Sequence, residues 1–212
     1  MSASGSAPHA AAASIDRSEI TGIVLAGGLG RRMSADGQGV DKGLQPFRGR
    51  PMAQHAIERL APQVATLLIN ANRNLERYRA FGCPVVSDAV SGFAGPLAGL
   101  HAGMRVARTR YVATVPCDSP FLPLDLVARL SAALASTPGA RLAVACTGAQ
   151  AHPVFALVER ALVDDLEAFL ASGRRKIDAW YEPLRVVAVD FDDEAAFRNI
   201  NTPQDLREQE PE

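Results

Sequence analysis

The sequence predicts an α/β protein in which helices cover both faces of a mostly parallel sheet, giving a three-layer α/β/α sandwich. From Ile20 onward, short apolar runs rich in β-branched residues alternate with longer segments of helical spacing. The runs lack the polar and apolar alternation of a strand with one solvated face, so both faces of the sheet should be buried. Alternating strands and helices are typical of this architecture.

Each predicted strand is too short to be a helix, and each predicted helix lies between two strands. The strands are expected at 23–25, 66–69, 85–86, 111–115, 142–146, 154–158 and 185–189. The helices are expected at 51–60, 96–106, 123–134 and 161–171. Three of these helices begin with Pro. Proline is favoured there because the first N–H groups of a helix have no partner within the helix, so the N–H that Pro lacks is not needed.

Length and composition favour one soluble domain. With 212 residues, 48% of them hydrophobic, the chain has enough apolar surface for a substantial core. Residues 1–17 are mostly Ala, Ser, Gly and Pro without the basic start and apolar segment of a secretory signal, which predicts a flexible tail. The length predicts a single domain over residues 18–212, and the lack of a secretory signal predicts a cytoplasmic location. No run approaches the roughly 20 apolar residues of a membrane span.

The charges nearly cancel, with 22 Lys and Arg against 23 Asp and Glu. A chain with a net charge of -1 has no overall field to hold a long polyanion, so nucleic acid and acidic membranes are not expected as partners. Binding of phosphate must therefore depend on a local group of residues.

Polar residues and glycines follow four of the predicted strands. In parallel α/β sheets, ligands bind at the carboxyl ends of the strands, close to the point where the strand order reverses. We therefore expect the residues at these ends to meet at one edge of the sheet: Gly27, Gly28, Asn70, Asp88 and Asp118.

The most specific motif is the glycine loop LAGGLGRRM at 25–33, followed by DKGL at 41–44. Glycines directly after a strand allow the backbone to approach a phosphate and several N–H groups to face one anion. Arg31, Arg32 and Lys42 add full positive charges, and an Arg can bind two phosphate oxygens at once. Together they predict a triphosphate-binding loop.

Other phosphate-binding motifs match less well. The chain contains no Gly-Lys-Ser or Gly-Lys-Thr, which excludes a Walker A loop. The dinucleotide pattern G-x-G-x-x-G is interrupted by Met33, and Asn70 stands where an acidic residue would bind a ribose, so a dehydrogenase is a poor second choice. A tight turn with a solvated basic face remains the structural alternative.

The glycine loop with DKGL resembles the nucleotidyltransferases that move a nucleoside monophosphate onto a phosphorylated acceptor. Six more segments in the same order are similar to the molybdenum cofactor guanylyltransferases of the molybdopterin nucleotidyltransferase family. They are INANRN (69–74), GPLAGL (95–100), PCDSPFLP (116–123), HPVFAL (152–157), GRRK (173–176) and NINTP (199–203). The resemblance implies a Rossmann-like nucleotidyltransferase fold and transfer of GMP from GTP to the phosphate of molybdopterin, with release of pyrophosphate.

The resemblance also implies cofactors, partners and site residues. Mg²⁺ would bind at Asp118. GTP and molybdopterin are the implied substrates, and other cofactor-synthesis proteins and acceptor molybdoenzymes are possible partners. The implied catalytic residues are Arg32, Lys42 and Asp118. Those implied for the nucleotide are Leu25, Ala26, Gly27, Gly28, Lys42, Asn70, Asp88 and Asp118. Those implied for the acceptor are Gly95, Gly99, Arg175, Asn199 and Asn201.

Each of these residues also has a structural alternative. Asp118 precedes Ser-Pro and by spacing alone is as suited to capping a helix as to binding a ligand. Asp88 could be a solvated loop residue, and Asn70 could hydrogen-bond within its own loop. Gly99 could serve only close helix packing, and Arg175 could lie at a solvated helix C-terminus.

Two further expectations concern the loops. Thr202 and Asp205 form an acceptable capping arrangement for a last helix. Segment 33–40 is longer than the usual link of the family and is expected to be a mobile lid ordered by nucleotide.

Three other functions remain open. A sister enzyme that uses CTP tends to have Leu-Ala-Ala-Gly in place of Leu25-Ala26-Gly27-Gly28, whereas Gly27 is expected to leave room beside the base. A sugar-1-phosphate nucleotidyltransferase would share the glycine loop but lack NINTP. A non-catalytic nucleotide-binding or cofactor-binding module would keep the loop and tolerate loss of Asp118.

Overall fold

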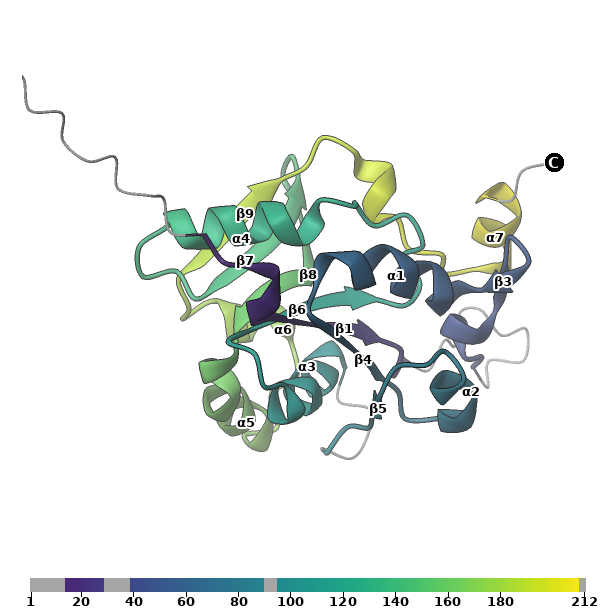
Figure 1. Ribbon diagram of the computed structural model, residues 1–212, viewed down its shortest axis with the longest axis horizontal. Helices are drawn as coiled ribbons and strands as arrows, with labels where there is room; N and C mark the ends of the chain where they lie inside the picture. The colour runs from purple at the N-terminus through teal and green to yellow at the C-terminus, as the bar shows by residue number, and fades with distance from the viewer. Residues whose placement is uncertain (1–13, 29–38, 90–94, 210–212) are drawn as a thin grey trace, which may run out of the picture.

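The computed structural model describes residues 14–28, 39–89 and 95–209. Its centre is a seven-stranded sheet of order β5-β4-β1-β6-β8-β7-β9 (Figure 1). The strands are β1 (Ile20–Leu25), β4 (Thr66–Asn70), β5 (Val85–Val86), β6 (Tyr111–Pro116), β7 (Leu142–Thr147), β8 (Gln150–Glu159) and β9 (Val186–Asp190). All seven predicted strands are therefore present. Strands β1 and β8 are three and five residues longer than expected, and the other five agree with the prediction to within one residue at each end.

The sheet is mostly parallel, as predicted. β1 pairs in parallel with β4 and β6, β4 with β5, and β7 with β9, whereas β8 is antiparallel to its neighbours β6 and β7. The chain runs from β1 outward to β4 and β5, and then returns to β6 on the other side of β1. The strand order therefore reverses beside β1, which is where an α/β sheet leaves a crevice for a ligand.

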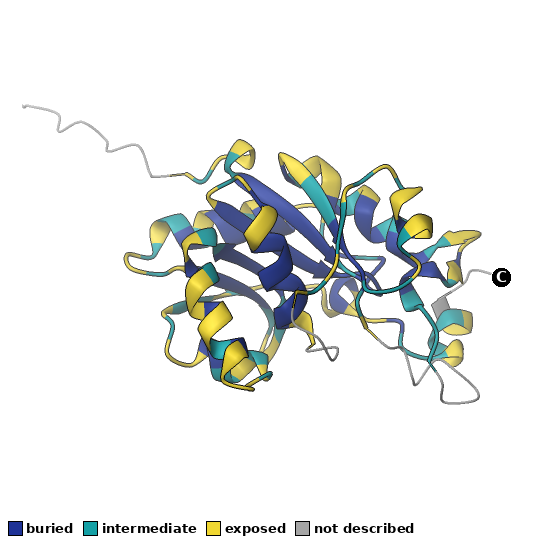
Figure 2. Cartoon of the chain, turned by 90° about the horizontal axis from the view of Figure 1, so that it is seen from below, coloured by how far each residue is buried: buried dark blue, intermediate teal, exposed yellow. Residues whose placement is uncertain are grey.

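Helices cover both faces of the sheet and complete the predicted three layers (Figure 1). One face packs against α1 (Met52–Leu60) and α4 (Leu126–Ser136), and the other against α3 (Pro96–Val106), α5 (Val163–Ala171) and α6 (Ile177–Tyr181). Successive residues of a strand alternate between the two faces: in β6, Tyr111 and Ala113 join the first layer and Val112 joins the second. Figure 2 shows the strands as the buried centre, with the exposed residues on the outer sides of the helices.

Several short elements differ from the sequence prediction. The additional helices are α2 (Leu75–Arg79) and α6, and the hairpin strands are β2 (Pro46–Phe47) and β3 (Arg50–Pro51). The expected last helix is present as α7 (Pro203–Gln209). The 3₁₀ turns are η1 (Arg17–Glu19), η3 (Lys42–Leu44), η4 (Ala61–Gln63), η5 (Arg160–Leu162) and η6 (Glu194–Phe197). Helix α4 begins three residues later than predicted, because Pro123 and the two residues after it form a turn that Leu126 N–H closes onto the Pro123 carbonyl.

The end of the predicted tail is ordered. Asp16 caps η1 by accepting a hydrogen bond from Ser18 N–H at 2.8 Å, and Arg17 donates to the Pro62 carbonyl at 2.8 Å. These two residues therefore contact the folded part of the chain. Residues 1–13 of the predicted tail lie outside the described residues.

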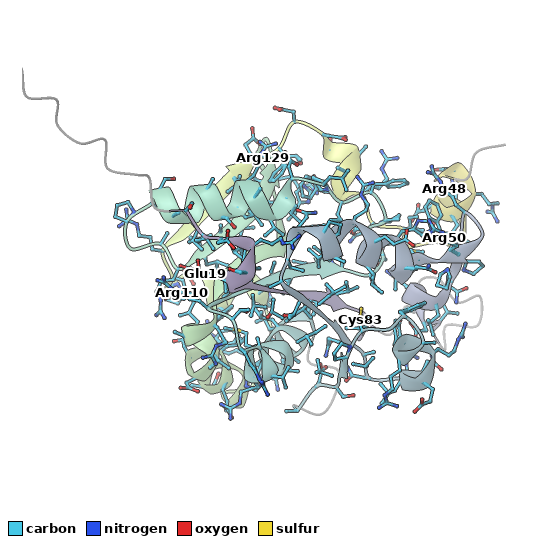
Figure 3. The ribbon with its side chains drawn as sticks, in the orientation of Figure 1. Glu19, Arg48, Arg50, Cys83, Arg110 and Arg129 are labelled. Atoms are coloured by element: carbon cyan, nitrogen blue, oxygen red, sulfur yellow. The ribbon has the colours of Figure 1, made fainter. Side chains whose placement is uncertain are left out.

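Charged side chains are distributed over separate elements (Figure 3). Arg48 and Arg50 lie at the β2–β3 hairpin, Arg129 lies on α4, and Arg110 lies directly before β6.

Within the described ranges, no helix combines the length and the apolar character needed to cross a membrane.

Candidate active site

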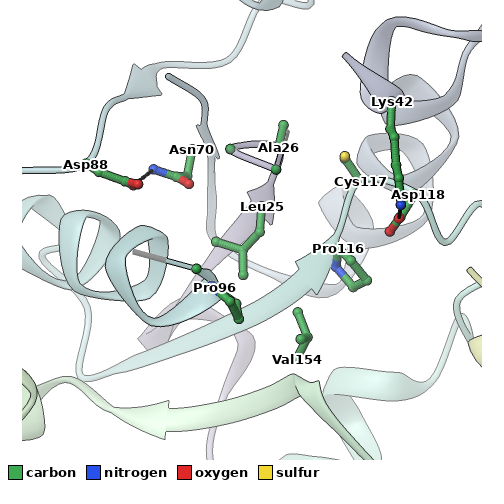
Figure 4. Close-up of a pocket in the computed structure, with 13 residues that line it drawn as sticks. Leu25, Ala26, Lys42, Asn70, Asp88, Pro96, Pro116, Cys117, Asp118 and Val154 are labelled. Carbon is green, nitrogen blue, oxygen red and sulfur yellow. Dashed lines mark hydrogen bonds and ion pairs between the residues drawn. The ribbon is translucent and has the colours of Figure 1, made fainter. Parts of the chain in front are cut away.

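A cavity of about 380 Å³ lies at the carboxyl ends of β1, β4 and β6, where the strand order reverses (Figure 4). Its lining residues are Leu25, Ala26, Gly27, Gly28, Lys42, Asn70, Asp88, Gly95, Pro96, Pro116, Cys117, Asp118 and Val154. The fold thus brings together all eight residues expected for a nucleotide, together with Gly95 from the acceptor set. Arg31, Arg32 and most of the predicted lid lie outside the described residues.

Backbone hydrogen bonds tie the three strand ends to one another. Ala26 N–H donates to the Asn70 carbonyl at 2.7 Å, and Cys117 N–H donates to the Leu25 carbonyl at 3.1 Å. The residues that follow β1 are therefore held between the ends of β4 and β6, and the start of the glycine loop lines the cavity. Gly95, at the entrance of α3, has a φ of 80°, a conformation that a residue with a side chain rarely adopts.

Asp88 is held by two asparagines at one end of the cavity. Its Oδ1 accepts a hydrogen bond from Asn70 Nδ2 at 2.8 Å, and its Oδ2 accepts one from Asn72 Nδ2 at 2.8 Å. Asp88 N–H in turn donates to Asn72 Oδ1 at 2.9 Å. Asp88 is therefore a fixed acceptor rather than a solvated loop residue, and the Asn70 amide hydrogen-bonds beyond its own loop.

Two glycines make room for this Asn–Asp cluster. A Cβ atom at Gly27 would lie 2.9 Å from Asn72 Nδ2 and 3.2 Å from Asn70 Oδ1. A Cβ atom at Gly99 would overlap Asn70 Oδ1 and lie 2.7 Å from Leu25 Cδ2. The space that Gly27 leaves is thus filled by asparagine side chains, not left open beside a base as the sequence suggested.

Lys42 and Asp118 form an ion pair at the opposite end of the cavity (Figure 4). Lys42 Nζ lies 2.8 Å from Asp118 Oδ2 and 2.5 Å from Asn201 Oδ1. Only 16% of the Lys42 side chain and 12% of the Asp118 side chain are exposed, so the pair is largely shielded from water. The Asp118 carboxylate therefore accepts from a lysine instead of capping a helix.

The loop before α7 supports this ion pair. Ile200 N–H donates to the Asp118 carbonyl at 2.8 Å. Asp205 accepts from Asn201 N–H at 2.8 Å and from Thr202 N–H at 2.9 Å, and the first of these bonds contributes most to the lowered pKa of the Asp205 carboxyl. Asp205 N–H donates to Thr202 Oγ1 at 3.1 Å, which confirms the predicted capping arrangement.

The cavity holds no activated nucleophile among its described residues. Burial first, and then the Asp118 and Asp41 carboxylates, raise the pKa of the Cys117 thiol well above its usual value. A thiol of this kind stays protonated near neutral pH and is a poor nucleophile.

The other residues expected for the acceptor lie outside the cavity lining. Gly99 is buried in α3 beneath Asn70, where it serves packing. Arg175 Nη1 donates to the Leu170 carbonyl at 2.6 Å and the Arg174 carbonyl at 2.7 Å, so it closes the C-terminus of α5. Asn199 accepts a hydrogen bond from Ser119 Oγ, beside Asp118. Contact of these residues with an acceptor stays a prediction.

The site can be compared with the needs of Mg²⁺. No group of three or more His, Cys, Asp or Glu side chains is placed to bind a metal in the described part of the chain. Asp118 Oδ2 and Asn201 Oδ1 nevertheless converge on one cation, the Lys42 ammonium. One carboxylate with substrate phosphates and water is a usual coordination for Mg²⁺, so these residues fit the ion.

Sequence reasoning did not identify four residues that lie outside the cavity lining but hydrogen-bond to Asp88 or to one another behind it: Asn72, Asn74, Asp41 and Tyr78. Asn74 Nδ2 donates to Asp41 Oδ2 at 2.9 Å, just as Asn70 and Asn72 donate to Asp88. The signal was present in INANRN, where three asparagines occur at every second position. Which carboxylate each would contact depends on loop placement and could not be predicted.

This chain is similar to known proteins over most of its length. A family model, the MobA-like NTP transferase domain, matches residues 22–186. The molybdenum cofactor guanylyltransferase of Ralstonia nicotianae is 56% identical over 203 residues, covering 92% of this chain and 97% of that protein. The protein of the same name from Cupriavidus pinatubonensis is 52% identical over 201 residues, covering 92% and 98%.

A solved structure shows the same fold. The crystal structure of molybdopterin-guanine dinucleotide biosynthesis protein A from Archaeoglobus fulgidus superposes with a TM-score of 0.71. Its sequence is 24% identical, and the match covers 89% of this chain and 95% of that one. The Rossmann-like nucleotidyltransferase fold expected from the sequence is thereby confirmed.

Proposed function

The chain belongs to the family of MobA-like NTP transferase domains, and we propose that it transfers GMP from GTP to the phosphate of molybdopterin, forming molybdopterin guanine dinucleotide and releasing pyrophosphate. One observation carries the proposal: the cavity at the carboxyl ends of β1, β4 and β6 is lined by all eight residues expected for the nucleotide. The similar proteins from Ralstonia nicotianae and Cupriavidus pinatubonensis are both named molybdenum cofactor guanylyltransferase.

The two ends of the cavity suit the two ends of a nucleotide. Asp88, held by its asparagines, lies at one end, and Lys42 and Asp118 lie at the other, with Leu25 and Ala26 between them (Figure 4). The Watson–Crick edge of guanine carries two neighbouring N–H donors, and a carboxylate accepts both. We infer that the base lies at Asp88 and that the phosphates lie at Lys42.

In the proposed reaction, an oxygen of the molybdopterin phosphate forms a bond to the α-phosphorus of GTP while the bond to the β-phosphate oxygen breaks. The attacking phosphate is already ionised at neutral pH, so no general base is needed. Lys42 holds positive charge beside the phosphates, where negative charge develops. Mg²⁺, held by Asp118 and substrate oxygens, would supply further charge neutralisation. Arg32 would act on the phosphates in the same way as Lys42.

The proposal is tested by offering the purified protein Mg²⁺, molybdopterin and either GTP, CTP or ATP, and following pyrophosphate and dinucleotide. We expect product with GTP and little with the other two nucleotides. Preference for CTP would identify the sister cytidylyl activity. Nucleotide binding without pyrophosphate release would instead identify a non-catalytic binding module.

Replacement of Gly27 by alanine should weaken the use of GTP. The new Cβ would lie 2.9 Å from Asn72 Nδ2, so the Asn72 side chain would have to shift and its hydrogen bond to Asp88 would weaken. Weakening of one hydrogen bond to a charged group predicts a decrease in kcat/KM for GTP of up to about tenfold. The measurement is steady-state kinetics with GTP, alongside thermal unfolding.

A control away from the cavity is Leu124→Ala, because Leu124 is 65% exposed and does not line the cavity, so this variant should use GTP normally. If Gly27→Ala had kinetics equal to those of the unmodified protein, the Asn–Asp cluster would not be the base-binding end.

A further inference from the structure

Asp41 directly precedes Lys42 but does not line the cavity. It occupies the N-cap position of η3, yet its side chain makes no capping hydrogen bond there. Its carboxylate instead accepts two hydrogen bonds from the region of α2, one from the Tyr78 hydroxyl and one from Asn74 Nδ2, the latter at 2.9 Å. The side chain of Asp41 is therefore committed to a neighbouring helix rather than to its own turn.

The turn that carries Lys42 is tightly enclosed. The Asp41 carbonyl accepts from Leu44 N–H and Gln45 Nε2, both at 3.2 Å, which closes η3. A Cβ atom at Gly43 would lie 2.5 Å from the Tyr78 hydroxyl oxygen and 3.2 Å from Cys117 Sγ. The position of η3 is therefore restricted by close packing between α2 and the residue that follows β6. Tyr78 is one of the side chains that restrict it.

Asn74 and Tyr78 are well suited to hold a carboxylate. Asn74 has a φ of 51°, a left-handed conformation that asparagine tolerates better than most residues, and this conformation starts α2. Tyr78 is fully buried, and burial, first among several causes, raises its pKa far above the usual value, so its hydroxyl remains a proton donor. Hydrogen bonds to a charged acceptor are stronger than those between neutral groups.

We propose that Asp41 is a positioning residue: held by Tyr78 and Asn74, it fixes η3 so that the Lys42 ammonium faces Asp118 at the phosphate end of the cavity. The catalytic part of this inference rests on the proposed function, because it assumes that Lys42 contacts phosphate. The geometric part does not, since it concerns the placement of Lys42 in the protein without substrate.

The alternative is that Tyr78 is only a core residue. It belongs to the larger hydrophobic cluster, and its ring makes an edge contact with Phe81 at a centroid distance of 5.9 Å. Tyr78→Phe keeps the ring and removes the hydroxyl, so a packing role would survive it. A positioning role would not.

The first test measures the chemical reactivity of Lys42. The chain has two lysines, Lys42 and the exposed Lys176, so Lys176 is an internal reference. The protein without nucleotide is acetylated with limiting acetic anhydride, and the labelling rates of the two lysines are compared by peptide mass spectrometry. In the unmodified protein Lys42 should react more slowly, because two oxygens hold its ammonium and 16% of its side chain is exposed.

The ratio of Lys42 to Lys176 labelling should rise about tenfold or more in each of three variants, Tyr78→Phe, Asp41→Asn and Asn74→Gly, as expected for the loss of one hydrogen bond to a charged group. Glycine is chosen at Asn74 because it accepts the positive φ. Tyr111→Phe is the matched control: Tyr111 is 7% exposed and begins β6, at the end of the strand away from the cavity. This variant should leave the ratio unchanged.

The second test is a double-mutant cycle with Lys42→Gln, read as kcat/KM for GTP. Tyr78→Phe should lower kcat/KM about tenfold when Lys42 is present, and less than about twofold in the Lys42→Gln background, because the residue through which it acts is gone. A purely structural role would give the same decrease in both backgrounds.

The proposal is overturned if Tyr78→Phe, Asp41→Asn and Asn74→Gly all have the same labelling ratio as Tyr111→Phe. It is also overturned if Tyr78→Phe lowers kcat/KM by the same factor with and without Lys42. Because three variants ask the same question, poor folding of one leaves the other two to decide it. Failure of the proposed function would appear separately, as absence of dinucleotide product from the unmodified protein with an unchanged labelling result.

Discussion

Asp118→Ala should lower formation of molybdopterin guanine dinucleotide by about three orders of magnitude, since a positioned metal ion contributes several kcal/mol to the stability of the transition state. Asp118 follows β6, lines the cavity and lies beside Lys42, so its loss would remove both the proposed Mg²⁺ ligand and the partner of the lysine. The measurement is the initial rate of pyrophosphate release at saturating GTP over a range of Mg²⁺ concentrations.

The matched control is Asp125→Ala. Asp125 is an aspartate seven positions further along the chain, exposed at the N-cap of α4, where its side chain makes no capping hydrogen bond. We expect this variant to turn over GTP normally. If Asp118→Ala were equally active, with the same dependence on Mg²⁺, Asp118 would not be the metal ligand, and the Lys42–Asp118 pair would be only a structural ion pair.

The convergence of the site residues was predictable because parallel strands end at one edge of a sheet. Gly27, Asn70, Asp88 and Asp118 follow four different predicted strands, and the parallel pairing of β5, β4, β1 and β6 places them around one cavity. The sequence therefore sufficed to predict that these residues meet at one edge of the sheet. Lys42, singled out through its place in DKGL, lines the same cavity.

What the sequence left open depends on contacts between loops. Helix α2 has five residues, too few for a helical period to be recognised, and its hydrogen bonds to Asp41 join positions more than thirty apart in the chain. The same holds for Asn201, which contacts Lys42 from 159 positions away. Such contacts follow from how the loops are placed on the finished sheet.

The reversed direction of β8 had a local signal. β7 and β8 are joined by Gly148 and Ala149 alone, and Gly148 has a φ of 54°. Two residues can join antiparallel neighbours but cannot return the chain for a parallel pair, which needs a crossover of a dozen or more residues. The predicted run at 154–158 missed this because β8 begins four residues earlier, at Gln150.

Lys42→Gln should lower kcat/KM for GTP by about 10² to 10³, the range found when one preorganised donor to a transition-state oxyanion is removed. Glutamine keeps much of the length of the side chain and removes its charge. Lys42→Arg should recover part of the activity, because the charge returns but a planar guanidinium does not reproduce a compact ammonium held between Asp118 and Asn201. Lys176→Gln, at the other and exposed lysine, is the control and should leave kcat/KM unchanged.

The two site variants should differ in what they change. Lys42→Gln leaves the Asp118 carboxylate shielded from water and without its cation, which should lower the thermal unfolding temperature in the absence of Mg²⁺. Addition of Mg²⁺ should raise that temperature in Lys42→Gln more than in the unmodified protein, because the ion then has no ammonium to displace from Asp118. The same addition should have little effect on Asp118→Ala. If Mg²⁺ shifted the unfolding temperature of all three proteins equally, the ion and the Lys42 ammonium would not share Asp118 as a ligand, and the assignment of the phosphate end of the cavity would have to be changed.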